Sequence, residues 1–425
     1  MTSKSGIFLF TASYPYSLAA EDTFIGPELP HLKKNFSSVS IVPKFSKGVA
    51  TDIPDEISVD LSLSGSLLSN LFVCHLIKNI FLSLNSLLFY KEIKKFPKKT
   101  LHPISLIRII LFLGTALITK KWIENYIEKN NVDLSKTIFY TYWLDGITMG
   151  ICLAKARYPG IIVVSRAHGT DIYDEQHNPP FIPFRPEIFH NLNRIYPASR
   201  DGQDYLSHKY PFYQKSFEYS SLGIKNPHFM TQQSSDGIFR IATCSYLVPV
   251  KRIELLIYGL KYLGELKNTR QFVWTHIGNG PLEKKLIKLS EKILPKNVKF
   301  EFLGFLSNTE VMNFYKNNPI DLFINVSQSE GGNPVSIMEA QSCGIPVIAT
   351  AVGGNNEIVT EKVGILLNPD PTPDEIANGI INFMEDPELI KRRRSYSKKN
   401  FEERYNSEVV FQRFTQQLKN FFRET

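Results

Sequence analysis

The sequence predicts an α/β protein with two doubly wound parallel sheets, and three observations lead to this prediction. Short apolar, β-branched runs alternate with segments of helical period along most of the 425 residues, a pattern typical of parallel sheets wrapped by helices. The length exceeds what one hydrophobic core usually supports. A polar stretch at residues 225–237, rich in Asn, Gln and Ser, separates two such halves and is interpreted as a linker.

We therefore expect a first domain at residues 1–224, a second at 238–395 and a charged helical tail at 396–425 that packs back toward the first domain. In the first domain, strands are expected at Ile7–Phe10, Val39–Val42, Thr137–Tyr140, Ile161–Ser165 and Arg194–Tyr196. In the second, they are expected at Ile238–Cys244, Gln271–His276, Lys299–Phe302, Leu322–Val326, Pro346–Ala349 and Gly364–Leu366. Such sheets bind ligands at the carboxyl ends of their strands, so a cleft between the domains is the predicted site.

Composition excludes several classes of protein. The chain is 43% hydrophobic and 21% charged, which is ordinary for a globular protein and argues against a disordered or collagen-like chain. Its four cysteines lie far apart without a C-x-x-C pair, which disfavours a disulfide scaffold or a cysteine-built zinc site and suits a reducing compartment. The residues after Met1 do not resemble a signal peptide. We expect a cytoplasmic protein.

The positive charge is concentrated in one segment. The whole chain has 49 Lys and Arg against 41 Asp and Glu, and residues 78–121 alone contain nine basic residues against Glu92. These charges flank apolar stretches at 61–90 and 104–119, an arrangement that does not favour nucleic-acid binding. Two interpretations stay open for segment 61–121: core helices with lysines at their solvated ends, or an interfacial surface for anionic headgroups. A spanning helix is the least favoured, because Arg108 interrupts the apolar run.

The segment most informative about chemistry follows the strand expected at Leu322–Val326. The turn Ser329-Glu330-Gly331-Gly332 leads into a helix expected to begin near Asn333-Pro334, with Asn333 as cap. Exposed amides and the positive end of the helix dipole suit a diphosphate there, and Glu339 follows within the helix. Lys251 and Arg252, between a strand and a helix, are placed to neutralise a departing diphosphate. The loop with Gly278 and Asn279 also joins a strand to a helix.

These segments resemble family 4 glycosyltransferases, which have the GT-B fold of two facing Rossmann-like domains. The resemblance rests on YLVPVKR, HIGNGPL, FLGF, DLFINVSQSEGGNPVSIMEA, CGIPVIAT and VGGNNEIV, which appear in the family's order. It is looser for YPYSLAAEDTF and RAHGTDIYDE in the first half.

The resemblance implies a role for each matched residue. Lys251 and Arg252 would contact the donor diphosphate, Glu330 the donor sugar and Glu339 the nucleotide ribose. The Gly332–Val335 amides would meet the phosphates. Further residues assigned by their place in the motifs are the donor-side Gly331, Asn333, Pro334, Gly278 and Asn279, His168 facing the donor sugar, and the acceptor-side Glu21 and Asp171.

Three departures from the family pattern stand out. Eight residues separate Glu330 from Glu339, where the family usually has seven. Tyr246 replaces an arginine commonly found five residues before the lysine. The glycine pair of the first domain's turn is absent from Ser17–Glu21. The role of that loop is therefore left open.

The implied reaction is transfer of a sugar, with retention, from a nucleoside-diphosphate sugar to an acceptor hydroxyl. A UDP- or GDP-linked donor is expected, without a metal or other cofactor. The acceptor is expected to be a lipid-linked or cell-surface polysaccharide intermediate, which would make the protein a peripheral enzyme of polysaccharide biosynthesis on the inner face of the membrane. Two alternatives remain: another GT-B enzyme, such as a phosphorylase or nucleotide-sugar epimerase, or a non-catalytic glycosyltransferase-like binding subunit.

Overall fold

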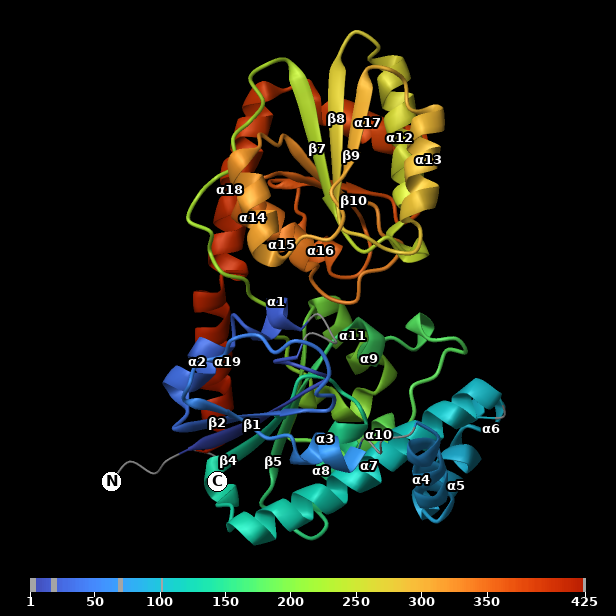
Figure 1. Cartoon of the computed structure of the whole chain (residues 1–425), viewed down its shortest axis with the longest axis vertical. Helices are drawn as coiled ribbons and strands as arrows, with labels where there is room; N and C mark the ends of the chain where they lie inside the picture. The colour runs from blue at the N-terminus through green and yellow to red at the C-terminus, as the bar shows by residue number, and fades with distance from the viewer. Residues whose placement is uncertain (1–4, 17–20, 68–71, 101, 423–425) are drawn as a thin grey trace. The chain divides into compact units, whose positions relative to one another are not determined.

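The computed structural model describes residues 5–16, 21–67, 72–100 and 102–422, and the chain divides into two compact units. The first unit comprises residues 1–220 and 411–425, and the second comprises residues 221–410. Each unit contains a six-stranded sheet accompanied by helices (Figure 1). The pairings of both sheets are parallel. The α/β class with two doubly wound sheets is thereby confirmed.

The first sheet has the strand order β3-β2-β1-β4-β5-β6, the doubly wound order that reverses direction between its first and fourth strands. Its strands are β1 (Gly6–Thr11), β2 (Ser38–Pro43), β3 (Ile57–Val59), β4 (Thr137–Thr141), β5 (Ile162–Ala167) and β6 (Arg194–Pro197). The helices of this unit are α1 (Asp22–Ile25), α2 (Leu29–Asn35), α3 (Ser62–Leu67), α4 (Phe72–Leu84), α5 (Leu87–Lys95), α6 (Pro97–Thr100), α7 (Pro103–Asn130), α8 (Gly146–Ala154), α9 (Gly169–Ile172), α10 (Arg185–Asn191) and α11 (Arg200–Lys209). The edge strand β3 was not predicted from the sequence.

The long helix α7 supplies much of the core of the first unit. It packs along α8, and its middle contributes buried side chains such as Leu113 and Ile123. By length and composition alone α7 could cross a bilayer, and it is the one helix of the described residues that meets that test. The core interpretation of segment 61–121 therefore holds for the middle of α7, whereas α4, α5 and α6 form a separate group beside its first turns (Figure 1).

The second sheet repeats the same winding, with the strand order β12-β11-β10-β7-β8-β9. Its strands are β7 (Ile238–Cys244), β8 (Gln271–Ile277), β9 (Val298–Phe302), β10 (Leu322–Asn325), β11 (Val347–Thr350) and β12 (Gly364–Leu367). The helices of this unit are α12 (Ile253–Leu266), α13 (Glu283–Ile293), α14 (Asn308–Asn317), α15 (Val335–Ser342), α16 (Asn355–Ile358), α17 (Pro373–Met384) and α18 (Pro387–Arg404). Here β7 and β10 are neighbours, so the winding reverses between them.

The segment interpreted as a linker is packed within the second unit. The Thr231 amide donates to the Cys343 carbonyl at 2.9 Å, and the Gln232 carbonyl accepts from the Ile320 amide at 3.0 Å. Residues 225–237 are therefore tied to this unit by backbone hydrogen bonds, and the division between units falls at 220–221 instead. At the other end, α19 (Ser407–Asn420) passes into the first unit from Phe411 onward.

Candidate functional site

The carboxyl ends of β7 and β10 bring two of the predicted residues together. Lys251 follows β7 and Glu330 follows β10, and these strands are adjacent and parallel. The Lys251 ammonium lies 2.6 Å from Oε1 of Glu330. The same oxygen accepts a hydrogen bond from the Asn325 amide at 3.1 Å. A partly buried cation and carboxylate thus lie at the reversal point of the second sheet, where ligands of doubly wound sheets bind.

Arg252 points to different partners from those that the resemblance implies. Its backbone is left-handed, with φ of 49°. Nε donates to the Val326 carbonyl at 2.8 Å, and Nη2 donates to the carbonyls of Ser327 and Pro369 at 3.0 and 2.8 Å. Nη1 pairs with the exposed Asp370 at 3.0 Å. The guanidinium therefore joins the loops after β10 and β12, and a contact with the diphosphate stays a prediction.

Helix α15 begins at Val335, one residue later than the start at Pro334 that a cap at Asn333 implies. Pro334 occupies the cap position, because its backbone is extended (ψ 124°), and the helix has no side-chain cap. The prediction that Asn333 caps this helix is therefore wrong. Its buried amide instead donates to Oγ of Ser221 at 3.2 Å. A helix start without a capping side chain keeps its first amides directed toward an anion.

Glu339 is a buried carboxylate within α15. It is 5% exposed, and Asn308, the first residue of α14, donates to its Oε1 at 2.5 Å. Burial raises the pKa of Glu339 to about 7, with the Asn308 amide acting in the opposite direction. The carboxyl group therefore changes protonation state near neutral pH, and only its ionised form can accept hydrogen bonds at both oxygens.

Close backbone approaches fix the two glycine loops around this edge. A Cβ on Gly353, whose φ is 47°, would lie 1.9 Å from the Glu330 carbonyl oxygen. A Cβ on Gly278 would lie 2.0 Å from the Ser245 carbonyl oxygen, and the Asn279 carbonyl accepts from the Leu247 amide at 2.8 Å. Glycine is thus required where these loops touch their neighbours. Gly278 and Asn279 hold the turn after β7, and Gly331 and Gly332 lie in the loop before α15.

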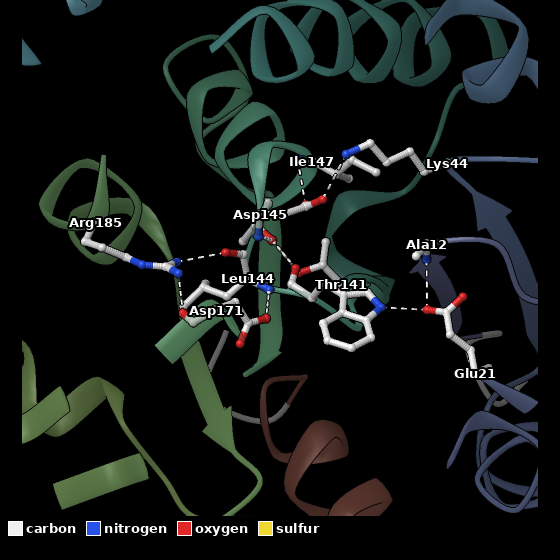
Figure 2. A network of polar contacts seen from close by, with 11 residues as sticks. Ala12, Glu21, Lys44, Thr141, Leu144, Asp145, Ile147, Asp171 and Arg185 are labelled. Carbon is white, nitrogen blue, oxygen red and sulfur yellow. Dashed lines mark hydrogen bonds and ion pairs between the residues drawn. The ribbon is translucent and has the colours of Figure 1, made fainter. Parts of the chain in front are cut away.

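In the first unit, the winding of the sheet reverses between β1 and β4, and Glu21 connects the residues that follow these two strands (Figure 2). Its Oε1 accepts from the Ala12 amide at 2.9 Å and from Nε1 of Trp143 at 2.6 Å. Its Oε2 accepts from the amides of Ser13 and Tyr14 at 2.6 and 2.8 Å. Glu21 therefore holds the turn after β1 and the indole after β4, which makes it a positioning residue. The other residues of its predicted loop, 17–20, lie outside the described part of the chain.

Asp171, which follows β5, also accepts hydrogen bonds from backbone amides of two different loops. One carboxylate oxygen accepts from the Leu144 amide at 2.7 Å, and the other accepts from the His168 amide. Arg185 donates to the Leu144 carbonyl at 2.8 Å and to the Asp171 carbonyl (Figure 2). Burial raises the pKa of Asp171 to about 7, against the effect of the Arg185 charge. A pocket of about 250 Å³ lies here, lined in part by Trp143, Asp171 and Arg185.

His168 is held in the neutral form. Burial, together with the nearby charge of Arg166, lowers its pKa to about 3. Its ring stacks on Tyr142 with centroids 5.0 Å apart. Its Nε2 is buried and has no hydrogen-bond partner among the described residues. A neutral imidazole with a free nitrogen can bind a hydroxyl but does not supply a positive charge.

Three residues of these networks were missed from the sequence: Asn325, Asn308 and Trp143. Each had a recognisable signal. Asn325 is a polar residue at the end of an apolar strand, and Asn308 directly follows Ser307, which caps α14 in a box with Glu310. Trp143 follows the end of β4 at the edge where ligands bind.

Comparison with known proteins agrees with this geometry. Residues 229–400 match the family model of glycosyl transferases group 1. A GDP-mannose-dependent monoacylated alpha-(1-6)-phosphatidylinositol monomannoside mannosyltransferase of Corynebacterium glutamicum is 27% identical over 42% of this chain and 47% of its own length. A putative colanic acid biosynthesis glycosyltransferase of Escherichia coli, WcaL, is 25% identical over 61% of this chain and 66% of its own length. Each match spans less than two thirds of the relative.

Solved structures share the fold over nearly the whole chain. The lipopolysaccharide outer core galactosyltransferase WaaB superimposes with a TM-score of 0.67 at 14% identity, covering 98% of this chain and 99% of its own. Anabaena HepE, solved with UDP and glucose, superimposes with a TM-score of 0.61 at 16% identity, covering 97% of this chain and 99% of its own. These superpositions, together with the two doubly wound sheets, show the GT-B fold, and residues 229–400 are similar to group 1 glycosyl transferases.

Proposed function

We propose that this protein transfers a sugar, with retention of anomeric configuration, from a nucleoside-diphosphate sugar to an acceptor hydroxyl. The observation that carries the proposal is the Lys251–Glu330 pair at 2.6 Å. It lies at the carboxyl edge of the second sheet, with Lys251 after β7 and Glu330 in the loop that leads to the start of α15, which has no side-chain cap. Sugar transfer needs a fixed positive charge where the leaving diphosphate forms, and the Lys251 ammonium, held in place by Glu330, would supply it together with the helix start.

In the proposed reaction, the bond between the anomeric carbon and the diphosphate oxygen breaks, and its electron pair stays on that oxygen. The acceptor oxygen bonds to the anomeric carbon, and its proton passes to the departing diphosphate oxygen. Lys251 and the α15 amides would stabilise the developing negative charge. Glu330 orients the ammonium through Oε1, and Oε2, which receives no hydrogen bond from the described residues, would accept one from a sugar hydroxyl.

The donor is proposed to be UDP- or GDP-linked. Glu339 would accept hydrogen bonds from the ribose hydroxyls, and its ionised form would bind them more strongly than its protonated form. HepE was solved with UDP and glucose, and the Corynebacterium relative is described as GDP-mannose-dependent. Both support a nucleotide sugar without deciding between the bases. We propose that the reaction needs no divalent metal, since a cation and a helix dipole can already face the leaving group.

The acceptor is proposed to be a lipid-linked or cell-surface polysaccharide intermediate, with the enzyme peripheral on the inner face of the membrane. Support comes from the names of two relatives, one acting on a phosphatidylinositol mannoside and one assigned to colanic acid biosynthesis. In the first unit, the pocket beside Trp143 and Asp171 is the candidate place for this acceptor.

The test is donor turnover by the purified full chain, measured as release of UDP or GDP with and without a lipid extract and with and without EDTA. We expect turnover that requires the extract, resists EDTA and yields a product of unchanged anomeric configuration. Dependence on inorganic phosphate would instead indicate a phosphorylase, and conversion of the donor sugar without acceptor an epimerase. Turnover in the wild type that persists in both Lys251→Met and Glu339→Gln would overturn the site.

A further inference from the structure

Helix α4 packs with its polar side turned inward. Asn79 and Ser83, one turn apart, are both 0% exposed. The Ser83 hydroxyl donates to the Ile110 carbonyl of α7 at 3.0 Å. At Gly114 the two helices approach so closely that a Cβ would lie 1.8 Å from the Asn79 side-chain oxygen. At these two positions the contact of α4 with α7 is therefore made by small and polar groups.

Three apolar residues of α4 face outward, whereas Leu82 of the same helix packs against the core. Ile77, Phe81 and Leu84 recur at helical spacing and are exposed, with Phe81 at 67%. A helix on the surface of a globular protein normally buries its apolar stripe and exposes its polar one. The reverse arrangement in α4 indicates that this face meets an apolar environment.

The neighbouring helices extend this exposed apolar character. Leu87, 78% exposed, and Tyr90 come from α5, and Ile104 and Ile107 come from the first turns of α7. These three helices pack against one another (Figure 1). We use the name outward apolar surface for the exposed apolar residues of this group: Ile77, Phe81, Leu84, Leu87, Tyr90, Ile104 and Ile107.

The same group of helices carries a strong positive charge. The exposed basic residues are Lys78, Lys91, Lys94, Lys95, Lys98 and Lys99. The sole acidic residue of segment 78–121, Glu92, is turned inward and accepts from the Phe184 amide at 2.8 Å. Exposed lysines on the same helices as exposed apolar side chains match the boundary between anionic headgroups and acyl chains.

We propose that the outward apolar surface and its six lysines form a docking surface for an anionic lipid membrane, with α4 lying in the plane of the interface. A second copy of this chain is disfavoured as the occupant, because it would bring like charges together. This proposal rests on the proposed function, because it assumes that the acceptor is held in a membrane.

Ion pairs and hydrogen bonds tie this surface to the segment that follows His168. Lys99 pairs with Asp174 at 3.3 Å, and Arg108 donates to the carbonyls of Phe181 and Pro179 at 2.6 and 3.1 Å. The pocket beside Trp143 is lined by residues on both sides of this segment. Docking would therefore hold the candidate acceptor pocket in a fixed position relative to the membrane.

The test is flotation of the full chain with vesicles of phosphatidylcholine alone or mixed with phosphatidylglycerol. We expect binding to the mixed vesicles that weakens with salt, and a loss of at least about tenfold in both Phe81→Glu and Leu87→Glu. Phe212→Glu is the matched control, since Phe212 is 99% exposed in the same unit but outside this group. Circular dichroism and thermal unfolding confirm that each variant is folded.

The proposal is overturned if the wild type does not bind vesicles that contain phosphatidylglycerol. It is also overturned if Phe81→Glu and Leu87→Glu bind these vesicles as strongly as Phe212→Glu does. Loss of a dimer in Leu87→Glu with unchanged vesicle binding would instead assign the surface to a second copy. Nucleotide-induced thermal stabilisation of the same variants separates this inference from the proposed function. Stabilisation without vesicle binding contradicts docking alone, and vesicle binding without stabilisation contradicts the donor site alone.

Discussion

Lys251 and Glu330 are 79 residues apart in the sequence, and their Nζ and Oε1 atoms are 2.6 Å apart in the structure. The two residues lie close together because they follow β7 and β10, which are adjacent and parallel in the sheet. The carboxyl ends of parallel neighbours share one edge, so the loops that follow them face each other. The strand order of the sheet therefore determines that Lys251 and Glu330 form a pair. Substitutions at the two residues test the role of this pair in the reaction.

Lys251→Met is expected to lower the rate of sugar transfer by about two to three orders of magnitude, because a fixed charge at the leaving group is lost. Its effect on the free energy of unfolding should be about 1 kcal/mol or less, since the ion pair is partly exposed. Lys285→Met is the control, as Lys285 forms an exposed pair with Glu254 in the same unit. Equal transfer rates in the two variants would refute a catalytic charge at Lys251.

Arg252→Lys is expected to lower the free energy of unfolding by about 1–3 kcal/mol, because lysine cannot reproduce the bonds to the carbonyls of Val326, Ser327 and Pro369. Urea unfolding measures the change, with the exposed Arg392→Lys as control. If stability is unchanged while nucleotide affinity falls, Arg252 acts on the diphosphate as the family resemblance implies.

Glu21→Gln is expected to lower the free energy of unfolding by about 2–3 kcal/mol, because one carboxylate oxygen becomes an NH₂ group that faces backbone and indole donors. The Trp143 indole N–H resonance should shift with loss of its 2.6 Å bond. NMR and urea unfolding measure both effects beside Glu56→Gln, an exposed position in the same unit. An unmoved indole signal would contradict the positioning role.

The raised pKa of Glu339, about 7 against an ordinary value of 4.5, predicts a pH dependence of stability. The folded protein binds a proton that the unfolded chain has released, so the stability contribution of Glu339 is present below pH 4.5 and is lost as pH rises toward 7. The loss is on the order of 3 kcal/mol. Glu339→Gln should remove this part of the pH dependence in urea unfolding from pH 5 to 8. Asp171, whose pKa is also raised to about 7, contributes equally to both proteins.

Nucleotide affinity should change with pH in the opposite direction. An ionised carboxylate accepts hydrogen bonds from ribose hydroxyls more strongly than its protonated form does, so affinity in the wild type is expected to rise as pH increases through 7. Calorimetric titration across this range is the measurement, with Glu339→Gln expected to show weaker, pH-independent binding. A wild-type affinity that falls over the same range would contradict the ribose role.

The sequence predicted the two sheets because their apolar strands and following helices are local patterns. It did not predict β3, since Ile57–Val59 is too short to show periodicity. The start of α15 was placed one residue early, because the preference of asparagine for helix caps is weaker than the geometry of the Pro334 backbone. Local preference and tertiary geometry therefore disagree where the chain approaches the candidate site.

Contacts between distant segments were the harder part to predict. Lys251 and Glu330 were recognised through motifs, but their pairing depends on sheet order. The polar partners Asn325 and Asn308 resemble ordinary loop residues until the fold brings them to a carboxylate. The outward direction of Phe81 was also hidden, because periodicity identifies an apolar stripe without showing which way it faces.

The central claim, a nucleotide-sugar site around α15, is tested most directly by thermal unfolding with UDP, GDP, ADP and CMP. Wild type, Glu339→Gln and the exposed control Glu388→Gln are compared, each with its own nucleotide-free baseline. One diphosphate is predicted to raise the Tm of the wild type and of Glu388→Gln but not that of Glu339→Gln. No shift with any nucleotide, or a shift that Glu339→Gln retains in full, would contradict the account.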